Sequence, residues 1–466
     1  MNSKLASMLC CLIMLVSFSG CTKVTQLVKD NQPTKAELLA EINEEHQRWE
    51  AAPAADPTPY LRHYDDPADA QKYFDYITDT YSEYDAEKEL TVEEAEEDVN
   101  YLFDAFYYDF AFYDYFGGHT VFDQAKAEIL QELQAKDSLT CKDLQEILVK
   151  HLTFIKDGHF NINHNFPAEK EIPFFFRQMM FVKTDSGYQD SKGKTVVSVD
   201  GHPDLDALFK RSISKEGYLV YYPVLLKKAK FDGTEWDKHV CDEQLTVHYA
   251  DGSTDVLTAD TWSQYYKDLP KGQNTDLRQT DGIPVFQFNS FEGSFLQEVN
   301  AAAAQMSDAA ISMLDLRSNV GGYEEVAHQW ITRYSRQRVQ GNGVRYDVVN
   351  PVSVAIQAHR WQTHDNILIL LSGKCSASSA EITMDLAYNL ENSLIIGENT
   401  NGCMIGNGGH VELPNSKCSV IMTSVCVYLL PEGADYFEEM RGLSPDIWVP
   451  AKEAETLAAK LMENLK

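Results

Sequence analysis

Apolar residues recur with a helical period between about residues 65 and 156. The segments "LTVEEAEEDVNYLFDAFYY" and "DQAKAEILQELQAKDSLTCKDLQEILVKHLTFI" repeat them at spacings of three and four. This spacing puts the apolar side chains on one face of each helix, so it predicts a helical N-terminal region at residues 65–164. The aromatic stretch "FDAFYYDFAFYDYF" also fits a sugar-stacking surface, but its helical spacing favours packing in a core.

The pattern changes to one typical of strands between residues 165 and 270. The segments "TVVSVDG" and "QLTVHYADGSTDVLT" are rich in β-branched and aromatic residues, and the second contains the hairpin signal Asp-Gly. We therefore expect a small β-rich domain at residues 165–270.

Strands and helices alternate from residue 271 to residue 466. Strands are predicted in "IPVFQFNSF", "AAISMLDLRS" and "NILILLSG", and helices in "FLQEVNAAAAQM", after "GGYEE" and in "AEITMDLAYNL". Strands joined through helices pair in parallel, so the pattern predicts an α/β core with a βαβ arrangement. The chain returns to a strand pattern in "CSVIMTSVCVYLL".

The N-terminus has the pattern of an export signal. Lys4 precedes an apolar run at residues 9–18, which is too short to span a bilayer. We expect a signal peptide at residues 1–20. The sequence "FSGC" resembles the end of a bacterial lipoprotein signal, in which Cys21 is lipidated and becomes the first residue of the mature chain. An ordinary cleaved signal and a short anchor are the alternatives.

Residues 21–64 look like a tether between the lipid anchor and the folded body. Their stretches "NQPTKAE" and "AAPAADPTP" are polar and rich in proline and alanine. We therefore expect little fixed structure before about residue 65.

Charge and cysteine content narrow the function classes. The chain carries 40 Lys and Arg against 71 Asp and Glu, a net charge of −31. Such a charge opposes binding to nucleic acid or to an anionic lipid surface, so contact with a membrane is expected only through the lipid anchor. No CxxC and no zinc-type histidine pair occurs, so no metal is expected. Disulfides and free buried thiols are both compatible with export.

Three serines crowd the end of a predicted strand in "SGKCSASSAE". Ser376, Ser378 and Ser379 lie where a helix follows the apolar stretch "ILILL". Unpaired N–H groups and the helix dipole at such a junction favour negative charge, which suits an oxyanion intermediate. Serine is also the preferred helix N-cap, so the junction alone leaves both interpretations open.

Two further stretches are candidates for chemistry. In "LDLRSNVGG", Gly321 and Gly322 permit close approach of the backbone to a ligand and so suit an oxyanion hole, although a plain turn explains them as well. In "KDGHF", His159 follows a helical run. A lone histidine is more often structural than catalytic.

Taken together, five motifs resemble the C-terminal processing, or tail-specific, serine peptidase family in its tricorn-core-like Ser-His branch. They are "DGH", "LDLRSNVGG", "SASSAE", "GENTNG" and "EEMRGLSPDI", in the order of the family, and the resemblance covers about residues 90–450. It implies a ClpP/crotonase-like βαβ core and a PDZ-like domain. The stretch "KTVVSVDGHPDLDALFK" resembles the latter part of such a domain, which either reads peptide ends or is degenerate.

The resemblance also assigns a nucleophile. In the family, the catalytic serine stands three residues before the glutamate of its motif, so Glu381 points to Ser378. The bacterial tail-specific branch pairs this serine with a lysine shortly after the "GE-T" turn, but here that position is Cys403. A neutral thiol does not replace an amine base, so a Ser–Lys dyad is not available.

The tricorn-like branch supplies the other two positions. It uses a histidine from a "GH" or "SH" stretch and a glutamate before a "G-x-x-P-D" motif, which correspond to His159 and Glu439. Such a set has the logic of a triad, with a nucleophile, a base and a residue that orients the base. This chain departs from the tricorn enzyme at Gly158, where that enzyme has a serine.

These observations lead to one hypothesis and one alternative. The hypothesis is an exported, cell-envelope serine peptidase, periplasmic or surface-facing, that acts on peptides or unfolded polypeptides without a metal or organic cofactor. Ser378 attacks, His159 transfers the proton and Glu439 orients His159. Backbone N–H groups near Gly321, Gly322 and Ser379 hold the oxyanion. The alternative is a non-catalytic ligand- or peptide-binding lipoprotein on the same fold. Cleavage specificity and oligomeric state do not follow from the sequence.

Overall fold

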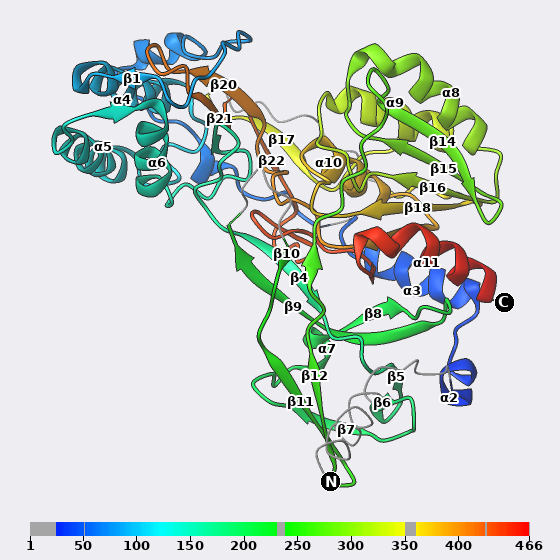
Figure 1. Ribbon diagram of the computed structural model, residues 1–466. Coiled ribbons are helices and arrows are strands. Elements are labelled where there is room, and N and C mark those ends of the chain that lie inside the picture. The colour runs from blue at the N-terminus through cyan, green and yellow to red at the C-terminus, as the bar shows by residue number, and fades with distance from the viewer. Residues whose placement is uncertain (1–24, 51, 231–237, 350–359, 425, 466) are drawn as a thin grey trace, which may run out of the picture.

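The structure, a computed structural model, describes residues 25–50, 52–230, 238–349, 360–424 and 426–465. Figure 1 shows helices of residues 92–151 on one side of the molecule and strands and helices of residues 275–335 and 367–387 on the other, with a strand-rich arm projecting below them. The predicted signal peptide and Cys21 lie outside the described residues. Within the described part, no helix is both long and apolar enough to cross a membrane.

The α/β part is built on a sheet of six strands. In spatial order these are β14 (Thr275–Thr280), β15 (Ile283–Phe288), β16 (Ile311–Asp315), β18 (Ile367–Ser372), β19 (Ser393–Gly397) and β25 (Ile447–Trp448). All neighbours from β15 to β25 pair in parallel, and β14 is an antiparallel edge strand. The α/β core predicted from the alternation of strands and helices is therefore confirmed.

Helices cover both faces of this sheet. One face packs against α8 (Leu296–Met306), α9 (Glu324–Ser335) and α10 (Ser379–Ala387), and the other against α11 (Ala451–Asn464) and α3 (Lys35–Gln47). In β18, Leu368 and Leu370 join the first cluster, whereas Ile367, Ile369 and Leu371 join the second. Side chains of a strand alternate between faces, so a strand buried on both sides needs an unbroken apolar run. This explains "ILILL".

The expectation of little fixed structure before residue 65 is wrong for helix α3. Thr34 and Glu37 close a capping box at its start, and Leu38 and Ile42 are buried in the core cluster shared with α11. Residues four apart lie on one face of a helix, so even a mostly polar segment can dock through two apolar side chains. A shorter helix, α2 (Gln26–Asp30), precedes it.

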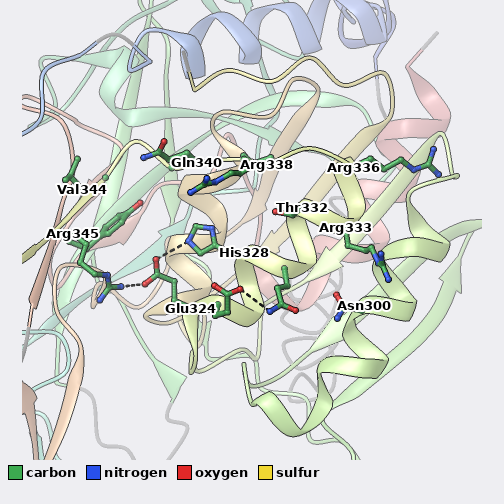
Figure 2. A pocket seen from close by; sticks show the side chains of 16 residues that line it. Asn300, Glu324, His328, Thr332, Arg333, Arg336, Arg338, Gln340, Val344 and Arg345 are labelled. Atoms are coloured by element: carbon green, nitrogen blue, oxygen red, sulfur yellow. Dashed lines mark hydrogen bonds and ion pairs between the residues drawn. The ribbon is translucent and has the colours of Figure 1, made fainter. Parts of the chain in front are cut away.

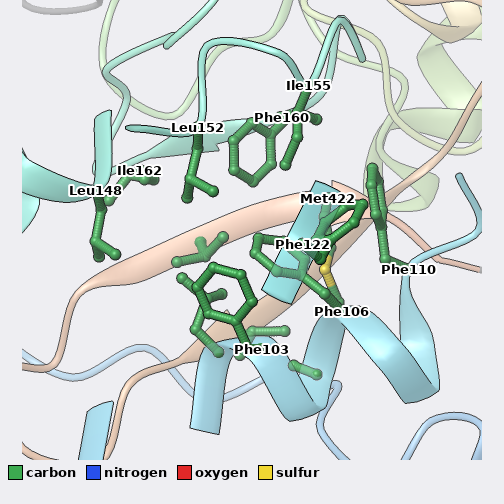
Figure 3. Packing of buried hydrophobic residues seen from close by; sticks show 14 of the residues in the cluster. Phe103, Phe106, Phe110, Phe122, Leu148, Leu152, Ile155, Phe160, Ile162 and Met422 are labelled. Atoms are coloured by element: carbon green, nitrogen blue, oxygen red, sulfur yellow. The ribbon is translucent and has the colours of Figure 1, made fainter. Parts of the chain in front are cut away.

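Three helices form the body around residues 92–151. They are α4 (Val92–Asp109), α5 (Gly118–Gln134) and α6 (Cys141–His151). Figure 3 shows Phe103, Phe106, Phe110, Phe122 and Phe160 packed together with Met422. The prediction that the aromatic stretch packs in a core is confirmed. Met422 belongs to β21 (Ser419–Thr423), which lies between β20 (Gly408–Glu412) and β3 (Asn161–Ile162), so this core holds the chain that enters β3.

The strand-rich arm contains two sheets. The first has β4 (Lys170–Phe175), β9 (Leu219–Ala229), β5 (Phe181–Thr184), β6 (Gly187–Asp190) and β8 (Phe209–Ile213), and the second has β7 (Val196–Val199), β11 (Gln244–Tyr249) and β12 (Thr254–Thr258). The predicted hairpin is confirmed, because β11 and β12 pair antiparallel around Asp251 and Gly252. The PDZ-like character of this arm and the domain boundaries stay predictions.

Smaller elements connect these parts. They are the strand pairs β1 (Glu89–Leu90) with β2 (Leu139–Thr140), β10 (Lys238–His239) with β13 (Trp262–Ser263), β17 (Val344–Asp347) with β22 (Cys426–Leu429) and β23 (Phe437–Glu438) with β24 (Gly442–Leu443), the short helix α7 (Leu205–Leu208), and 3₁₀ turns at Thr58–Tyr60, Pro67–Lys72 and Gly293–Phe295.

Candidate active site

The three serines between β18 and α10 have different environments. The Ser376 hydroxyl is buried, donates to the Leu316 carbonyl at 2.8 Å and accepts from the Gly373 N–H at 3.0 Å. The Ser379 hydroxyl donates to the Gly322 carbonyl at 2.6 Å. These two serines therefore hold the junction against the neighbouring loop at residues 316–322.

Ser378 has an unusual backbone conformation. Its φ is 53° and its ψ is −115°, a combination of backbone angles that residues other than glycine rarely adopt. Strained residues of this kind persist only where their surroundings hold them, and they cluster at functional sites. Here the Ser378 N–H donates to Glu381 Oε2 at 3.0 Å and to Cys403 Sγ at 3.2 Å. The turn that carries Ser378 is thus fixed from two sides.

Glu381 ties this junction to the loop after β19. Its side chain is buried and accepts hydrogen bonds from the Thr400 hydroxyl, from the Gly402 N–H at 2.8 Å and from the Cys403 N–H at 3.0 Å. The glutamate that marked the motif in the sequence is therefore a structural link, which sets the position of Ser378 relative to residues 400–403.

Gly321 and Gly322 lie directly against the serine junction. A Cβ on Gly321 would come within 2.8 Å of both the Ala377 carbonyl oxygen and Ser378 Cβ. The Gly321 N–H already donates to Asn319 Oδ1 at 2.8 Å. The N–H groups of Gly322 and Ser379 have no acceptor in the part of the chain that the structure describes. Of the three predicted oxyanion-hole residues, these two therefore offer free donors, and Gly321 offers close approach.

His159 lies just before β3, and its side chain is 11% exposed. Its N–H donates to Asp157 Oδ1 at 3.0 Å, and the same oxygen lies 3.8 Å from His159 Nδ1. The other oxygen of Asp157 accepts from the Thr423 N–H at 3.0 Å, which anchors it to β21. Neither ring nitrogen of His159 is hydrogen-bonded to any described residue. The imidazole is therefore not bonded to Ser378 in this structure.

The surroundings of His159 favour its neutral form. Burial lowers the pKa of His159 below its ordinary value, the carboxylate of Asp157 opposes this shift, and the nearby ammonium of Lys170 adds to it. A neutral imidazole is the form that can accept a proton from a nucleophile.

Glu439 contacts the backbone beside His159 and not its ring. Its Oε1 accepts from the Gly158 N–H at 2.8 Å and its Oε2 from the Ile405 N–H at 3.3 Å. Burial, together with the nearby Asp157 and Glu381, raises the pKa of Glu439 well above its usual range. Glu439 thus positions the chain that carries His159. The carboxylate nearest the ring belongs to Asp157, which the sequence interpretation missed although it stands in the "DGH" motif.

Gly158, the residue before His159, lets the chain that carries His159 pack closely against the loop at residues 402–403. A Cβ on Gly158 would lie 2.0 Å from the Gly402 carbonyl oxygen and 2.5 Å from Cys403 Cβ. A serine, as the tricorn branch has here, would not fit against this loop. Since Cys403 also contacts the Ser378 N–H, it lies between the chain of His159 and that of Ser378.

Two buried lysines that the sequence interpretation missed flank the same loop. The Lys170 amine donates to the Gly158 carbonyl at 3.0 Å and to Asn401 Oδ1. The Lys374 amine donates to the carbonyls of Thr400 and Arg441. Burial, and then the like charge of Lys170, lowers the pKa of Lys374 to about 7. No local pattern distinguishes these lysines from the exposed ones.

We expect Cys403 to be dispensable for chemistry. Burial raises the pKa of its thiol well above the usual range, so the thiol stays neutral and is neither a base nor a nucleophile. Cys403→Ala should lose one weak hydrogen bond from the Ser378 N–H and retain kcat/KM for peptide hydrolysis within a few-fold. A collapse of activity in a variant with an unchanged circular dichroism spectrum would show that the thiol takes part.

A known family model matches most of the α/β part of the chain. Residues 282–449 match the model of the family described as peptidase family S41. None of the curated proteins matches the chain significantly. Among solved structures, the chain is similar to mature CPAF (12% identity, TM-score 0.41, 80% of this chain and 96% of that one) and to the photosystem II D1 C-terminal processing protease (14%, 0.37, 80% and 97%). It is also similar to a lipoprotein from Streptococcus agalactiae (12%, 0.39, 83% and 100%). Likeness this low carries no conclusion about activity.

Proposed function

We propose that the chain is a serine-type peptidase of peptidase family S41, whose model matches residues 282–449, and that it is an exported enzyme that hydrolyses peptide bonds in peptides or unfolded polypeptides. The observation that carries this proposal is the strained backbone of Ser378, held beside Gly321 and Gly322. The hydroxyls of Ser376 and Ser379 are committed to carbonyl oxygens, which leaves Ser378 as the candidate nucleophile.

In the proposed mechanism, Ser378 Oγ attacks the scissile carbonyl carbon while His159 accepts the hydroxyl proton. The free N–H groups of Gly322 and Ser379 stabilise the oxyanion, and His159 then returns the proton to the leaving amine. Water hydrolyses the acyl-enzyme by the same route. The hydrogen bond between His159 and Ser378 forms when substrate binds, since catalytic hydrogen bonds are often long in free enzymes and tighten with substrate.

The orienting role is divided between two carboxyl groups in this proposal. Asp157 stabilises the imidazolium that forms at His159, because its Oδ1 is the carboxylate oxygen near Nδ1. Glu439 holds the Gly158 N–H and so fixes the approach of the His159 chain. The arrangement resembles a Ser-His-Glu triad in its residues, with Glu439 acting through the backbone. No metal or organic cofactor has a part in these steps.

One observation favours the alternative of a non-catalytic binding lipoprotein, namely the absence of a hydrogen bond from the His159 ring to the described residues. A fluorophosphonate probe separates the two, because only an activated serine reacts with it. Covalent labelling of the purified wild-type protein, together with hydrolysis of an unfolded polypeptide, would support the peptidase. A correctly folded protein that is neither labelled nor hydrolytic would be a binding protein.

We also propose that the mature chain is anchored in the cell envelope by a lipid on Cys21. The apolar run at residues 9–18 and the "FSGC" sequence support this. The precursor expressed in a bacterial host should partition into the membrane fraction, and Cys21→Ser should release it or block its processing. Wild-type protein found unlipidated in the soluble fraction of its native host would contradict the proposal.

A further inference from the structure

A large pocket with several arginines lies beside helix α9, away from the serine junction. Its volume is about 1260 Å³. Four arginines and two glutamates line it, and they are Arg333, Arg336, Arg338, Arg345, Glu324 and Glu325. Figure 2 shows Arg345, Glu324 and His328 toward one end of the pocket, with Arg333 and Arg336 toward the other. An arginine-rich pocket is unexpected in a chain with a net charge of −31.

Two of these arginines form no ion pair with an acidic residue in the part of the chain that the structure describes. Arg345 pairs with Glu324, which also accepts from His328, and Arg336 pairs with Asp308. In contrast, Arg333 and Arg338 are exposed and have neither an ion pair nor a hydrogen bond with any described residue. A guanidinium presents a planar fork of donors that matches a carboxylate. The pocket therefore offers two unoccupied carboxylate-binding groups.

The pocket is connected with both walls of the candidate active site. On one side, α9 begins at Glu324, two residues after Gly322. On the other side, Arg345 Nη1 donates to Cys426 Sγ at 2.8 Å, and the Cys426 N–H donates to Asn407 Oδ1 at 3.3 Å. Asn407 precedes Gly408, where an added Cβ would lie 3.7 Å from the His159 ring. The Glu324–Arg345 pair thus joins the oxyanion side of the site to its histidine side.

We propose that this pocket binds an acidic segment of the polypeptide substrate and directs it along α9 away from the scissile bond. The proposal rests on the proposed peptidase function and adds the substrate class. Along the pocket, Arg338 and then Arg333 follow the Glu324–Arg345 pair (Figure 2). The net negative charge of the whole protein repels acidic polypeptides at long range. Attraction to an acidic segment therefore has to come from a local group of positive charges, which the arginines of this pocket supply.

Binding to an inactive protein tests this directly. In the Ser378→Ala protein, fluorescence anisotropy is measured with a fluorescein-labelled peptide that contains a run of glutamates and with the same peptide carrying glutamines. We expect the glutamate peptide to bind about tenfold more tightly, and added salt to weaken this peptide alone. Equal affinities for the two peptides would overturn the proposal. So would displacement of the glutamate peptide by an equal concentration of inorganic phosphate, which would indicate a site for small free anions.

Variants with the same change in net charge test whether the preference for the glutamate peptide comes from the arginine pocket. Arg333→Glu with Arg338→Glu should abolish the preference for glutamate. Lys136→Glu with Lys142→Glu makes the same change in net charge on two exposed lysines, one just after α5 and one in α6, and should retain the preference. Loss of the preference in both double variants would show a general charge effect and overturn the proposal. If the circular dichroism spectrum of the Arg333→Glu, Arg338→Glu protein shows misfolding, the Arg333→Gln, Arg338→Gln protein is used in its place.

Fluorophosphonate labelling separates this inference from the function on which it rests. Labelling of Ser378 should be the same in the wild type and in the Arg333→Glu, Arg338→Glu variant, because neither arginine contacts the serine junction. A labelled enzyme without a preference for glutamate would overturn the inference and leave the peptidase intact. A preference for glutamate without any labelling would support the pocket as an acidic-peptide site and overturn the peptidase.

Discussion

Ser378→Ala should lower kcat/KM for peptide hydrolysis by about four to six orders of magnitude and abolish fluorophosphonate labelling. In triad enzymes, removal of the nucleophile leaves only the contribution of the oxyanion hole and of substrate binding. The prediction depends on the geometry of the junction, where Ser378 is the one of the three serines with a strained backbone and its Cβ lies against Gly321. Mass spectrometry of the labelled wild-type protein should place the adduct on residue 378.

The neighbouring serines supply matched controls. Ser379→Ala loses the hydrogen bond to the Gly322 carbonyl but retains its N–H, so it should still be labelled. Ser376→Ala removes a buried hydroxyl that makes two hydrogen bonds and should destabilise the fold by about 1–2 kcal/mol without preventing labelling. Labelling that survives Ser378→Ala and disappears in either control would assign the nucleophile to that other serine.

His159→Ala should reduce kcat/KM almost as much as Ser378→Ala, because the two groups act as a unit. His410 provides a control, since it is also a buried histidine but lies on β20 and interacts with the Thr78 carbonyl and the Tyr81 ring. His410→Ala should keep most of the activity. Near-wild-type turnover in His159→Ala, with Ser378→Ala inactive, would mean that another residue is the base.

The pH dependence of kcat/KM identifies the base without any alanine substitution. The base must be neutral, so kcat/KM falls as the pH drops through its pKa. Burial lowers the pKa of His159, and the acid limb should therefore lie below the ordinary histidine value of about 6.5. If Lys374 were the base, the limb would lie near its pKa of about 7 instead. A limb near 7 that disappears in Lys374→Met would overturn the assignment to His159.

The sequence by itself determined the elements of the core. Local spacing identified the helices around the aromatic stretch, the Asp-Gly hairpin and the alternation of strands and helices after residue 271, because each pattern follows from which face of one element is buried. The same local logic failed for α3. Its few apolar residues dock against distant parts of the chain, and His46 of this helix is hydrogen-bonded to Asp446, so its order comes from long-range contacts.

The site shows the same division. Motif order selected Ser378, His159 and Glu439 as candidates, since each stands in a recognisable local stretch. Only the tertiary structure placed the Glu439 carboxyl on the Gly158 N–H and Asp157 beside the His159 ring, because these contacts depend on how separate loops pack.

The arginine pocket is likewise a property of the folded chain. Arg333 and Arg338 are the two ends of the stretch "RYSRQR", which also contains Arg336, and Arg345 lies on β17, which pairs with β22. A sequence gives their number and sign but not the direction of each side chain or the distance to the nearest carboxylate. Among the residues that the structure describes, folding leaves the guanidinium groups of Arg333 and Arg338 without an ion pair in the pocket beside α9, and the strength of an electrostatic interaction depends on distance and burial.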